Sequence, residues 1–283
     1  VEVEIGNDVP RDRPLKLVAH GWIHPTDSSI NVALSQGSQT PPNGLALEVA
    51  DAQGRFRVAR PGLGFPSGKD KTILIPLDGL LPEHGERRLR LTTNLEIFWD
   101  RIAWAVGRPD VPVTPRRLTL TSADLRYRGF SVMSQRESSS PERPRYVVEG
   151  TAPRWLDLEG FYTRFGDVRP LLSGVDDRYV IMNAGDELAL RFQEAPAPAA
   201  GMTRDFVVVG DGWVKDGDYN TTFSRTVLPL PTHANGRYDT APRTLDDDPV
   251  YRRHADDFAT YHTRYVTPSA RRALRDASPG SSR

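Results

Sequence analysis

The feature that most limits how this chain can fold is the close spacing of its prolines and glycines. The 283 residues include 24 prolines and 23 glycines, which interrupt the chain repeatedly. Both residue types end regular elements and favour turns, so the apolar runs between them are short. Short apolar runs bounded by turn residues are typical of β-strands rather than of helices. The sequence therefore predicts a mainly β protein with antiparallel sheets.

An antiparallel sandwich of jelly-roll type is predicted for residues 15–122, where these runs follow one another closely. The expected strands are Leu15–Ile23, Ile30–Ser35, Leu45–Val49, Arg55–Val58, Thr72–Leu77, Arg88–Thr92, Ile97–Val106 and Arg117–Leu120. Apolar and polar residues alternate in Arg88–Thr92, which predicts one core face and one solvent face. The sequence Asp51-Ala-Gln-Gly54 predicts a hairpin turn.

A second, smaller β region with long loops is predicted for residues 123–248. Its expected strands are Tyr146–Glu149, Tyr179–Met182, Leu188–Phe192 and Phe206–Val209. The polar stretch Ser131–Arg145 is expected to form an exposed loop.

The two ends of the chain are expected to lie outside these β regions. Residues 1–14 are charged and bounded by prolines, which predicts an N-terminal arm. Asp248 followed by Pro249 is typical of an N-cap and the first helical position. Residues 249–283 are therefore expected to contain one helix, about Pro249–Tyr265, and a disordered tail.

The overall composition argues against several classes of function. Lys plus Arg and Asp plus Glu both number 37, so the net charge is zero. A balanced charge predicts neither nucleic-acid binding nor a general attraction to anionic membranes. The absence of cysteine excludes thiol catalysis, disulfides and thiolate metal sites. No apolar run approaches the roughly 20 residues that a membrane-spanning helix needs.

No catalytic constellation is evident, so the protein is expected not to be an enzyme. The carboxylate pairs Asp157/Glu159 and Asp176/Asp177 are close neighbours in sequence, whereas a glycosidase needs two acids that face each other across a cleft. No Gly-x-Ser-x-Gly nucleophile motif occurs.

Several aromatic and polar side chains are candidates for a carbohydrate site. Trp99 could stack on a sugar ring while Asn94, Glu96 and Asp100 accept hydrogen bonds from hydroxyl groups. Trp22 and Trp213 are further candidates for the same role. The alternative is that the aromatic residues around Trp99 belong to the core, because aromatic side chains bury large apolar areas.

One loop has the composition of a calcium site. Asp211, Asp216, Asp218 and Asn220 supply oxygen ligands at close spacing, as a hard cation requires. The loop is not an EF-hand, because Thr221 replaces the expected glycine. The alternative is a structural turn, in which Asp, Asn and Gly are also common.

Several separated motifs between about Leu15 and Tyr238 resemble one family of proteins. These motifs are Thr93–Ile102, Arg126–Ser131, Tyr162–Leu171, Asp176–Ile181, Gly185–Leu188 and Asp211–Thr221. They are similar to the C-terminal part, after the propeller, of large exported bacterial proteins with FG-GAP repeats and an ASPIC/UnbV region, the cartilage acidic protein-like group. The first half also resembles a galactose-binding-like jelly roll.

The resemblance implies an exported, β-rich interaction module, in the periplasm or at the cell surface. The calcium-binding propeller repeats are absent, so calcium is not implied by it. We therefore expect a non-catalytic accessory subunit that docks on a larger protein assembly, including one at a membrane. The alternative is a carbohydrate-binding module with a structural calcium ion. An aromatic side chain in a concave polar pocket would favour the carbohydrate, and a flatter apolar surface would favour docking.

Overall fold

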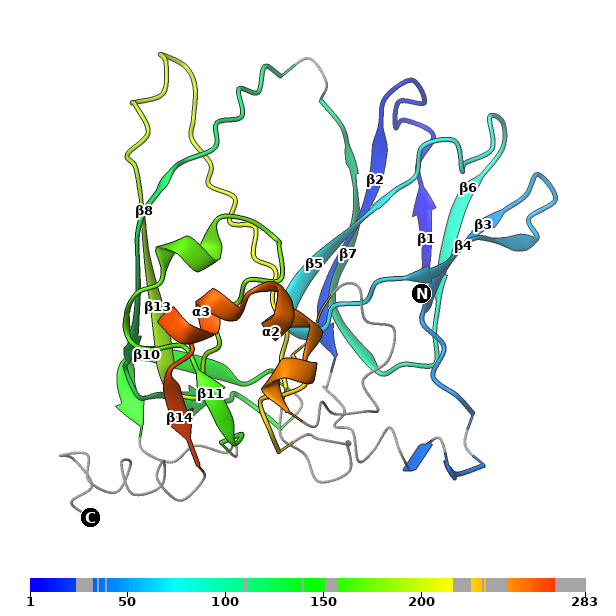
Figure 1. Cartoon of the computed structure of the whole chain (residues 1–283). Helices are drawn as coiled ribbons and strands as arrows, with labels where there is room; N and C mark the ends of the chain where they lie inside the picture. Colours follow the sequence, from blue (N-terminus) through cyan, green and yellow to red (C-terminus); the bar gives the residue numbers. More distant parts are fainter. Residues whose placement is uncertain are drawn as a thin grey trace. The chain divides into compact units, whose positions relative to one another are not determined.

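The computed structural model confirms a mainly β chain with antiparallel sheets and two short helices near the C-terminus (Figure 1). It describes residues 1–23, 33–34, 36–38, 40–108, 111–138, 140–150, 157–215, 225–230, 232 and 244–267, without the side chains of 68, 69 and 147–150. The chain divides into two compact units. The first unit comprises Val1–Pro115 and Met133–Pro144, and the second comprises Arg116–Val132 and Arg145–Arg283.

The first unit contains two antiparallel sheets, with the strand orders β1-β6-β3-β4 and β5-β2-β7. Their strands are β1 (Glu2–Ile5), β2 (Leu15–Ile23), β3 (Leu45–Ala50), β4 (Phe56–Leu63), β5 (Gly68–Pro76), β6 (Arg87–Thr92) and β7 (Ile97–Val106). The predicted strands Leu15–Ile23 and Ile97–Val106 have the same bounds in the structure. The predicted turn is also present, since the Gly54 N–H donates to the Asp51 carbonyl at 2.9 Å.

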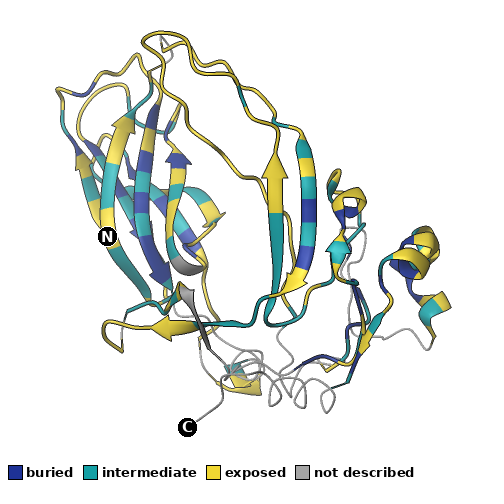
Figure 2. Cartoon of the chain, turned by 90° about the vertical axis from the view of Figure 1, so that its left-hand side faces the viewer, coloured by how far each residue is buried: buried dark blue, intermediate teal, exposed yellow. Residues whose placement is uncertain are grey.

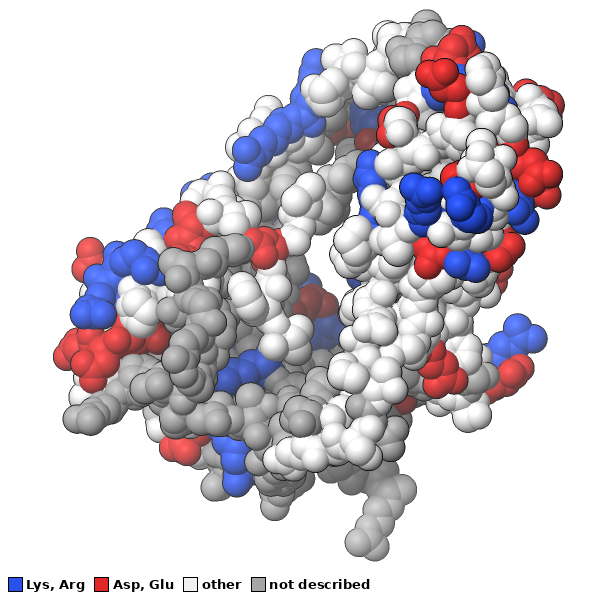
Figure 3. All heavy atoms as spheres, turned by 90° about the vertical axis from the view of Figure 1, so that its right-hand side faces the viewer, with Lys and Arg blue, Asp and Glu red and all other residues white. Residues whose placement is uncertain are grey.

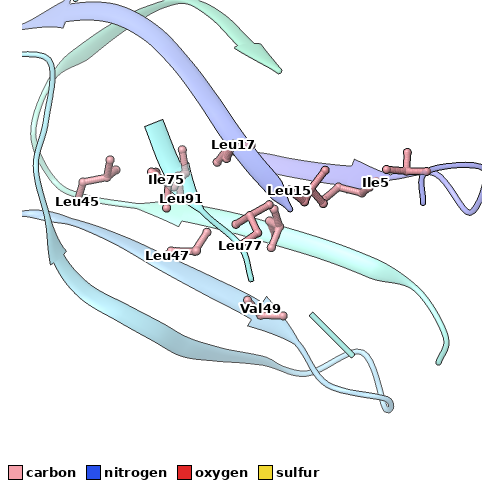
Figure 4. Close-up of a cluster of buried hydrophobic side chains, with 11 residues drawn as sticks. Ile5, Leu15, Leu17, Leu45, Leu47, Val49, Ile75, Leu77 and Leu91 are labelled. Carbon is pink, nitrogen blue, oxygen red and sulfur yellow. The ribbon is translucent and has the colours of Figure 1, made fainter. Parts of the chain in front are cut away.

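One apolar core joins both sheets of the first unit. Along β6, buried and half-buried residues alternate, as the sequence pattern predicts. Leucines on β2, β3 and β6 point into a common interior (Figure 4). Leu17, Leu47 and Leu89 are fully buried. Buried and more exposed positions follow one another along the strands of this unit (Figure 2). Burial of each such leucine contributes about 2 kcal/mol to folding. The two sheets are therefore held together as a sandwich.

The N-terminal residues are part of the sandwich, so the prediction of an arm over residues 1–14 is wrong. β1 pairs with β6, with Val3 opposite Leu89, and the side chains of Ile5 and Val9 are buried. The buried guanidinium of Arg87 donates to the carbonyls of Gly6 and Val9. Apolar residues scattered among the charges of this segment supply the burial that holds it.

The second unit contains smaller sheets, with the orders β12-β8-β13 and β11-β14. Strands β9 and β10 form a hairpin whose tip belongs to the first unit. The elements are β8 (Leu120–Tyr127), β9 (Phe130–Ser134), β10 (Arg143–Gly150), β11 (Gly160–Tyr162), β12 (Gly166–Asp167), β13 (Asp186–Phe192), β14 (Arg264–Val266), the 3-10 helices η1 (Arg169–Leu172) and η2 (Leu245–Asp247), and the helices α2 (Pro249–Arg253) and α3 (Ala255–Thr260).

Two separate apolar clusters lie in the described part of the second unit. One surrounds β8 and consists of Ala123, Leu125, Val168 and Leu171. The other gathers short segments around α2 and α3 and consists of Leu158, Tyr162, Val227, Leu230, Val250, Phe258 and Val266. The second unit therefore has divided cores, in agreement with its short strands and long connections.

The single C-terminal helix predicted over Pro249–Tyr265 is in fact two helices and a strand. The predicted cap is present, because the Asp248 carboxylate accepts from the N–H groups of Val250 and Tyr251. The helix ends after one turn at His254, whose φ of −132° and ψ of 40° are not helical. The chain resumes as α3 and then as β14, which pairs with β11.

Other predicted segments also differ from the structure. Ser131–Arg145 is not a loop but contains most of β9 and the start of β10. Tyr179–Met182 and Phe206–Val209 are not strands, and most of Arg117–Leu120 precedes β8. The expected strand Ile30–Ser35 and the expected tail fall largely or wholly outside the described residues.

Positive and negative side chains are interspersed on the surface drawn in Figure 3. This mixture agrees with equal numbers of basic and acidic residues. Within the described part of the chain, no helix has the length and apolar character needed to cross a membrane.

Candidate functional site

A cavity of about 670 Å³ lies in the first unit, between the strands of one sheet and the tip of the β9–β10 hairpin. This volume is in the range of small-molecule sites in proteins. The sheet contributes His20 and Trp22 from β2, Asp70 from β5, and Phe98, Trp99 and Asp100 from β7.

A β-bulge shapes the sheet side of the cavity. His20 pairs with Arg101 and Gly21 pairs with Trp99, so Asp100 is the extra residue on β7. Gly21 permits this close approach, because a Cβ at that position would lie 2.4 Å from the Phe98 carbonyl oxygen. Bulges re-aim side chains and are frequent beside functional sites. Here the bulge places the Asp100 carboxylate at the surface beside the aromatic residues.

In the described part of the chain, three aromatic residues line the cavity. Trp22 and Phe98 are paired across β2 and β7 and stack with ring centroids 5.1 Å apart and planes 22° apart. Trp22 is only 7% exposed, whereas Phe98 and Trp99 are half-buried. Trp99 also packs against the core of the sandwich. The cavity thus has a fixed aromatic floor, because its rings are held by the surrounding packing.

The hairpin tip forms the opposite wall of the cavity, with Ser134, Gln135, Arg136, Ser140, Pro141 and Arg143. Its turn is ordered by its own side chains. The Gln135 amide donates to the carbonyls of Ser138 and Ser140 at 3.2 and 2.7 Å. The Ser134 hydroxyl donates to the Arg143 carbonyl at 3.1 Å.

An ion pair attaches the hairpin tip to the sheet. Arg143 donates to the Asp70 carboxylate on β5. Close by on the sheet, His20 Nδ1 lies 2.9 Å from Thr72 Oγ1. These contacts hold polar side chains of the hairpin and of the sheet in place beside the aromatic floor.

The structure brings together three of the six predicted ligand-binding residues. Trp22, Trp99 and Asp100 line the same cavity. Asn94 and Glu96 do not line it, although they precede β7. The side-chain amide of Asn94 instead accepts from the Asn43 N–H at 2.6 Å and donates to the Pro41 carbonyl at 2.8 Å, which fixes a loop. Trp213 belongs to the second unit and is 51% exposed.

The predicted calcium loop is only partly described. Asp211 is exposed, whereas Asp216, Asp218 and Asn220 lie outside the described residues. Within the described part, no group of three or more His, Asp or Glu side chains is placed to hold a metal ion. Calcium binding at this loop therefore stays a prediction.

The hairpin wall and Asp70 were not predicted from the sequence. The signal that could have revealed the hairpin is two short runs rich in apolar residues, Phe130-Ser-Val-Met-Ser134 and Tyr146-Val-Val148, separated by a polar turn. Asp70 has no comparable signal, because its role depends on Arg143, which is 73 residues away.

No protein-family model, curated protein or solved structure matches this chain. The resemblance to the ASPIC/UnbV group therefore stays a prediction.

Proposed function

We propose that this protein is a non-catalytic recognition module that acts outside the cytoplasm and binds carbohydrate in the cavity of the first unit. The observation that carries the proposal is the aromatic floor of Trp22, Phe98 and Trp99 beneath walls of polar side chains. Sugars present apolar C–H faces and polar hydroxyl groups together. A site of this composition can satisfy both, by stacking on the rings and by hydrogen bonding to the walls.

Two further parts of the proposal rest on the sequence. The resemblance to exported proteins supports a location in the periplasm or at the cell surface. We also propose that the sandwich is a galactose-binding-like jelly roll, and a two-sheet antiparallel core is compatible with it. A structural calcium ion at Asp211 and its neighbours is proposed as a secondary feature, tested by comparing ligand binding in calcium and in chelator.

The direct test is a titration of the purified chain with each of a set of neutral oligosaccharides. Intrinsic tryptophan fluorescence is the readout. A saturable change is expected, because Trp22 and Trp99 line the cavity. Phe98→Ala should weaken binding about fivefold or more, since stacking on one aromatic ring contributes about 1 kcal/mol or more.

Trp104→Ala is the matched control for this variant. Trp104 lies on the same strand and is 38% exposed, but it does not line the cavity. The affinity of the Trp104→Ala variant for the sugar should equal that of the parent chain. Equal loss in both variants, or no saturable binding by the parent chain, would rule out the site.

A second candidate function is that of an accessory subunit docking on a larger protein assembly, including one at a membrane. It is favoured by the apolar segment Phe206–Val209, whose residues are 68 to 89% exposed. Exposed apolar surface of this kind is typical of protein interfaces. Purification from the native source, with the chains identified by mass spectrometry, should then yield a complex of fixed stoichiometry. Substitution of Val208 by Lys should release the partner without unfolding the chain.

A further inference from the structure

Some charged side chains of the cavity have a partner of opposite charge, and others do not. Among the described residues, five titratable side chains line it: His20, Asp70, Asp100, Arg136 and Arg143. Arg143 and Asp70 form an ion pair with each other. His20 is held beside the Thr72 hydroxyl.

Asp100 remains as a carboxylate without a hydrogen bond or ion pair to any described residue. It is exposed, and the bulge of β7 places it next to Trp99. The remaining cation of the cavity, Arg136, does not neutralise the charge of the Asp100 carboxylate. The Arg136 side chain is 90% exposed and lies 3.9 Å from the carboxylate of its neighbour Glu137. An unpaired negative charge therefore accompanies the aromatic floor.

An unpaired carboxylate beside aromatic rings favours a cationic ligand. A protonated amine is attracted to the electron-rich faces of Trp and Phe and also donates hydrogen bonds to a carboxylate. A carboxylated or phosphorylated sugar would be repelled by Asp100. Neutral sugars would use only the stacking and the ordinary hydrogen bonds.

We propose that the ligand of this cavity is an amino sugar, whose protonated amine pairs with Asp100 while its ring stacks on the aromatic floor. This inference rests on the proposed carbohydrate-binding function and specifies the chemical class of the sugar.

The test compares three probes of equal length: oligomers of glucosamine, of N-acetylglucosamine and of glucose. Titrations at about pH 6 keep the glucosamine amine protonated, because α-amino-like groups have pKa values of about 7.7–8.0. The glucosamine oligomer should bind about tenfold more tightly than the other two, a difference of about 1.4 kcal/mol. Asp100→Asn should reduce this preference to about twofold or less, because it removes the negative charge and keeps the size of the side chain.

Two controls separate specific recognition from general charge attraction. Glu96→Gln removes an exposed carboxylate that precedes β7 and does not line the cavity, so the preference should persist. A lysine oligomer should not compete, because it has the charge but not the sugar ring. Competition by the lysine oligomer, or an undiminished preference in Asp100→Asn, would overturn the inference.

The outcomes also distinguish the amino-sugar assignment from the proposed carbohydrate-binding function on which it rests. Equal binding of all three sugars would overturn the amino-sugar assignment and leave carbohydrate binding intact. Binding of none of them would overturn both.

Discussion

At the residue scale, His262 links the stability of the second unit to pH. Its side chain is 4% exposed, packs edge-on against Phe258 and lies 3.1 Å from the Thr163 hydroxyl. Burial lowers the pKa of His262 from 6.5 to about 4, although the charge of Asp257 opposes this shift. Asp257 is itself paired with Arg178, whose hydrogen bonds hold the pKa of that carboxyl below its usual value. The imidazole is therefore neutral in the folded protein at pH 7.

We expect this chain to lose stability as the pH falls from 6.5 to 4. In this window the unfolded state binds a proton at His262 and the folded state does not, so protons favour unfolding. Between pH 7.5 and 4.5 the loss from this group is about 2 kcal/mol. Urea unfolding should show that His262→Asn, which cannot titrate, loses about 2 kcal/mol less over the same interval. An identical pH dependence in the two proteins would show that folding does not change the pKa of His262.

At the scale of elements, Asp248 determines where α2 begins. It is fully buried, and its carboxylate accepts from the N–H groups of Val250 and Tyr251 at 2.9 and 3.0 Å. It also accepts from the Leu230 N–H at 3.3 Å, which joins the helix to a neighbouring segment. Because α2 has only five residues, its own backbone bonds cannot hold it, and the cap matters more than in a long helix.

Asp248→Ala should lower the free energy of unfolding by about 1–2 kcal/mol, since a lost N-cap leaves buried N–H groups unpaired. The measurement is the urea midpoint followed by circular dichroism. Asp246→Ala is the control, because Asp246 is exposed on the adjacent η2 and should change stability by less than about 0.5 kcal/mol. Equal effects of the two substitutions would show that general charge, not capping, is responsible.

At the scale of the whole molecule, the chain combines a well-packed sandwich with an apolar segment that is packed against little. The first unit buries seven leucines in one core, Leu15, Leu17, Leu45, Leu47, Leu77, Leu89 and Leu91. In the second unit, Phe206–Val209 has a strand-forming composition, yet no backbone hydrogen bond joins it to another described residue. Such segments promote self-association when they meet another open β edge.

Val208→Lys should raise the concentration at which the protein self-associates and change its folded stability by less than about 0.5 kcal/mol. The reason is that Val208 is 81% exposed, so a lysine there loses no packing. Light scattering during concentration and urea unfolding provide the two readouts. Val168→Lys is the contrasting variant, because Val168 is fully buried and its replacement should unfold the second unit. A comparable loss in both variants would mean that Val208 is packed in solution.

Local sequence patterns were sufficient to predict a structural feature where that feature depends on residues close together in the sequence. Strands β2 and β7 have their predicted bounds, and the turn at Asp51 and the cap at Asp248 have the predicted contacts. Prediction failed where strand formation depends on a pairing partner that composition does not reveal. The apolar run Phe206–Val209 has a strand-like composition but no strand partner among the described residues. The polar stretch after Ser131 contains strand residues, because β9 and β10 pair with each other.

The sequence by itself determined the β class, because closely spaced prolines and glycines leave room only for short elements. It also pointed to Trp22, Trp99 and Asp100 as candidates. Only the tertiary structure decided that these three share one cavity with Asp70 and Arg143, and that Asn94 instead fixes a loop. The physical reason is that a cavity is made by strand register and by contacts between residues far apart in the chain, such as the bulge at Asp100 and the Arg143–Asp70 ion pair. No local pattern encodes those contacts.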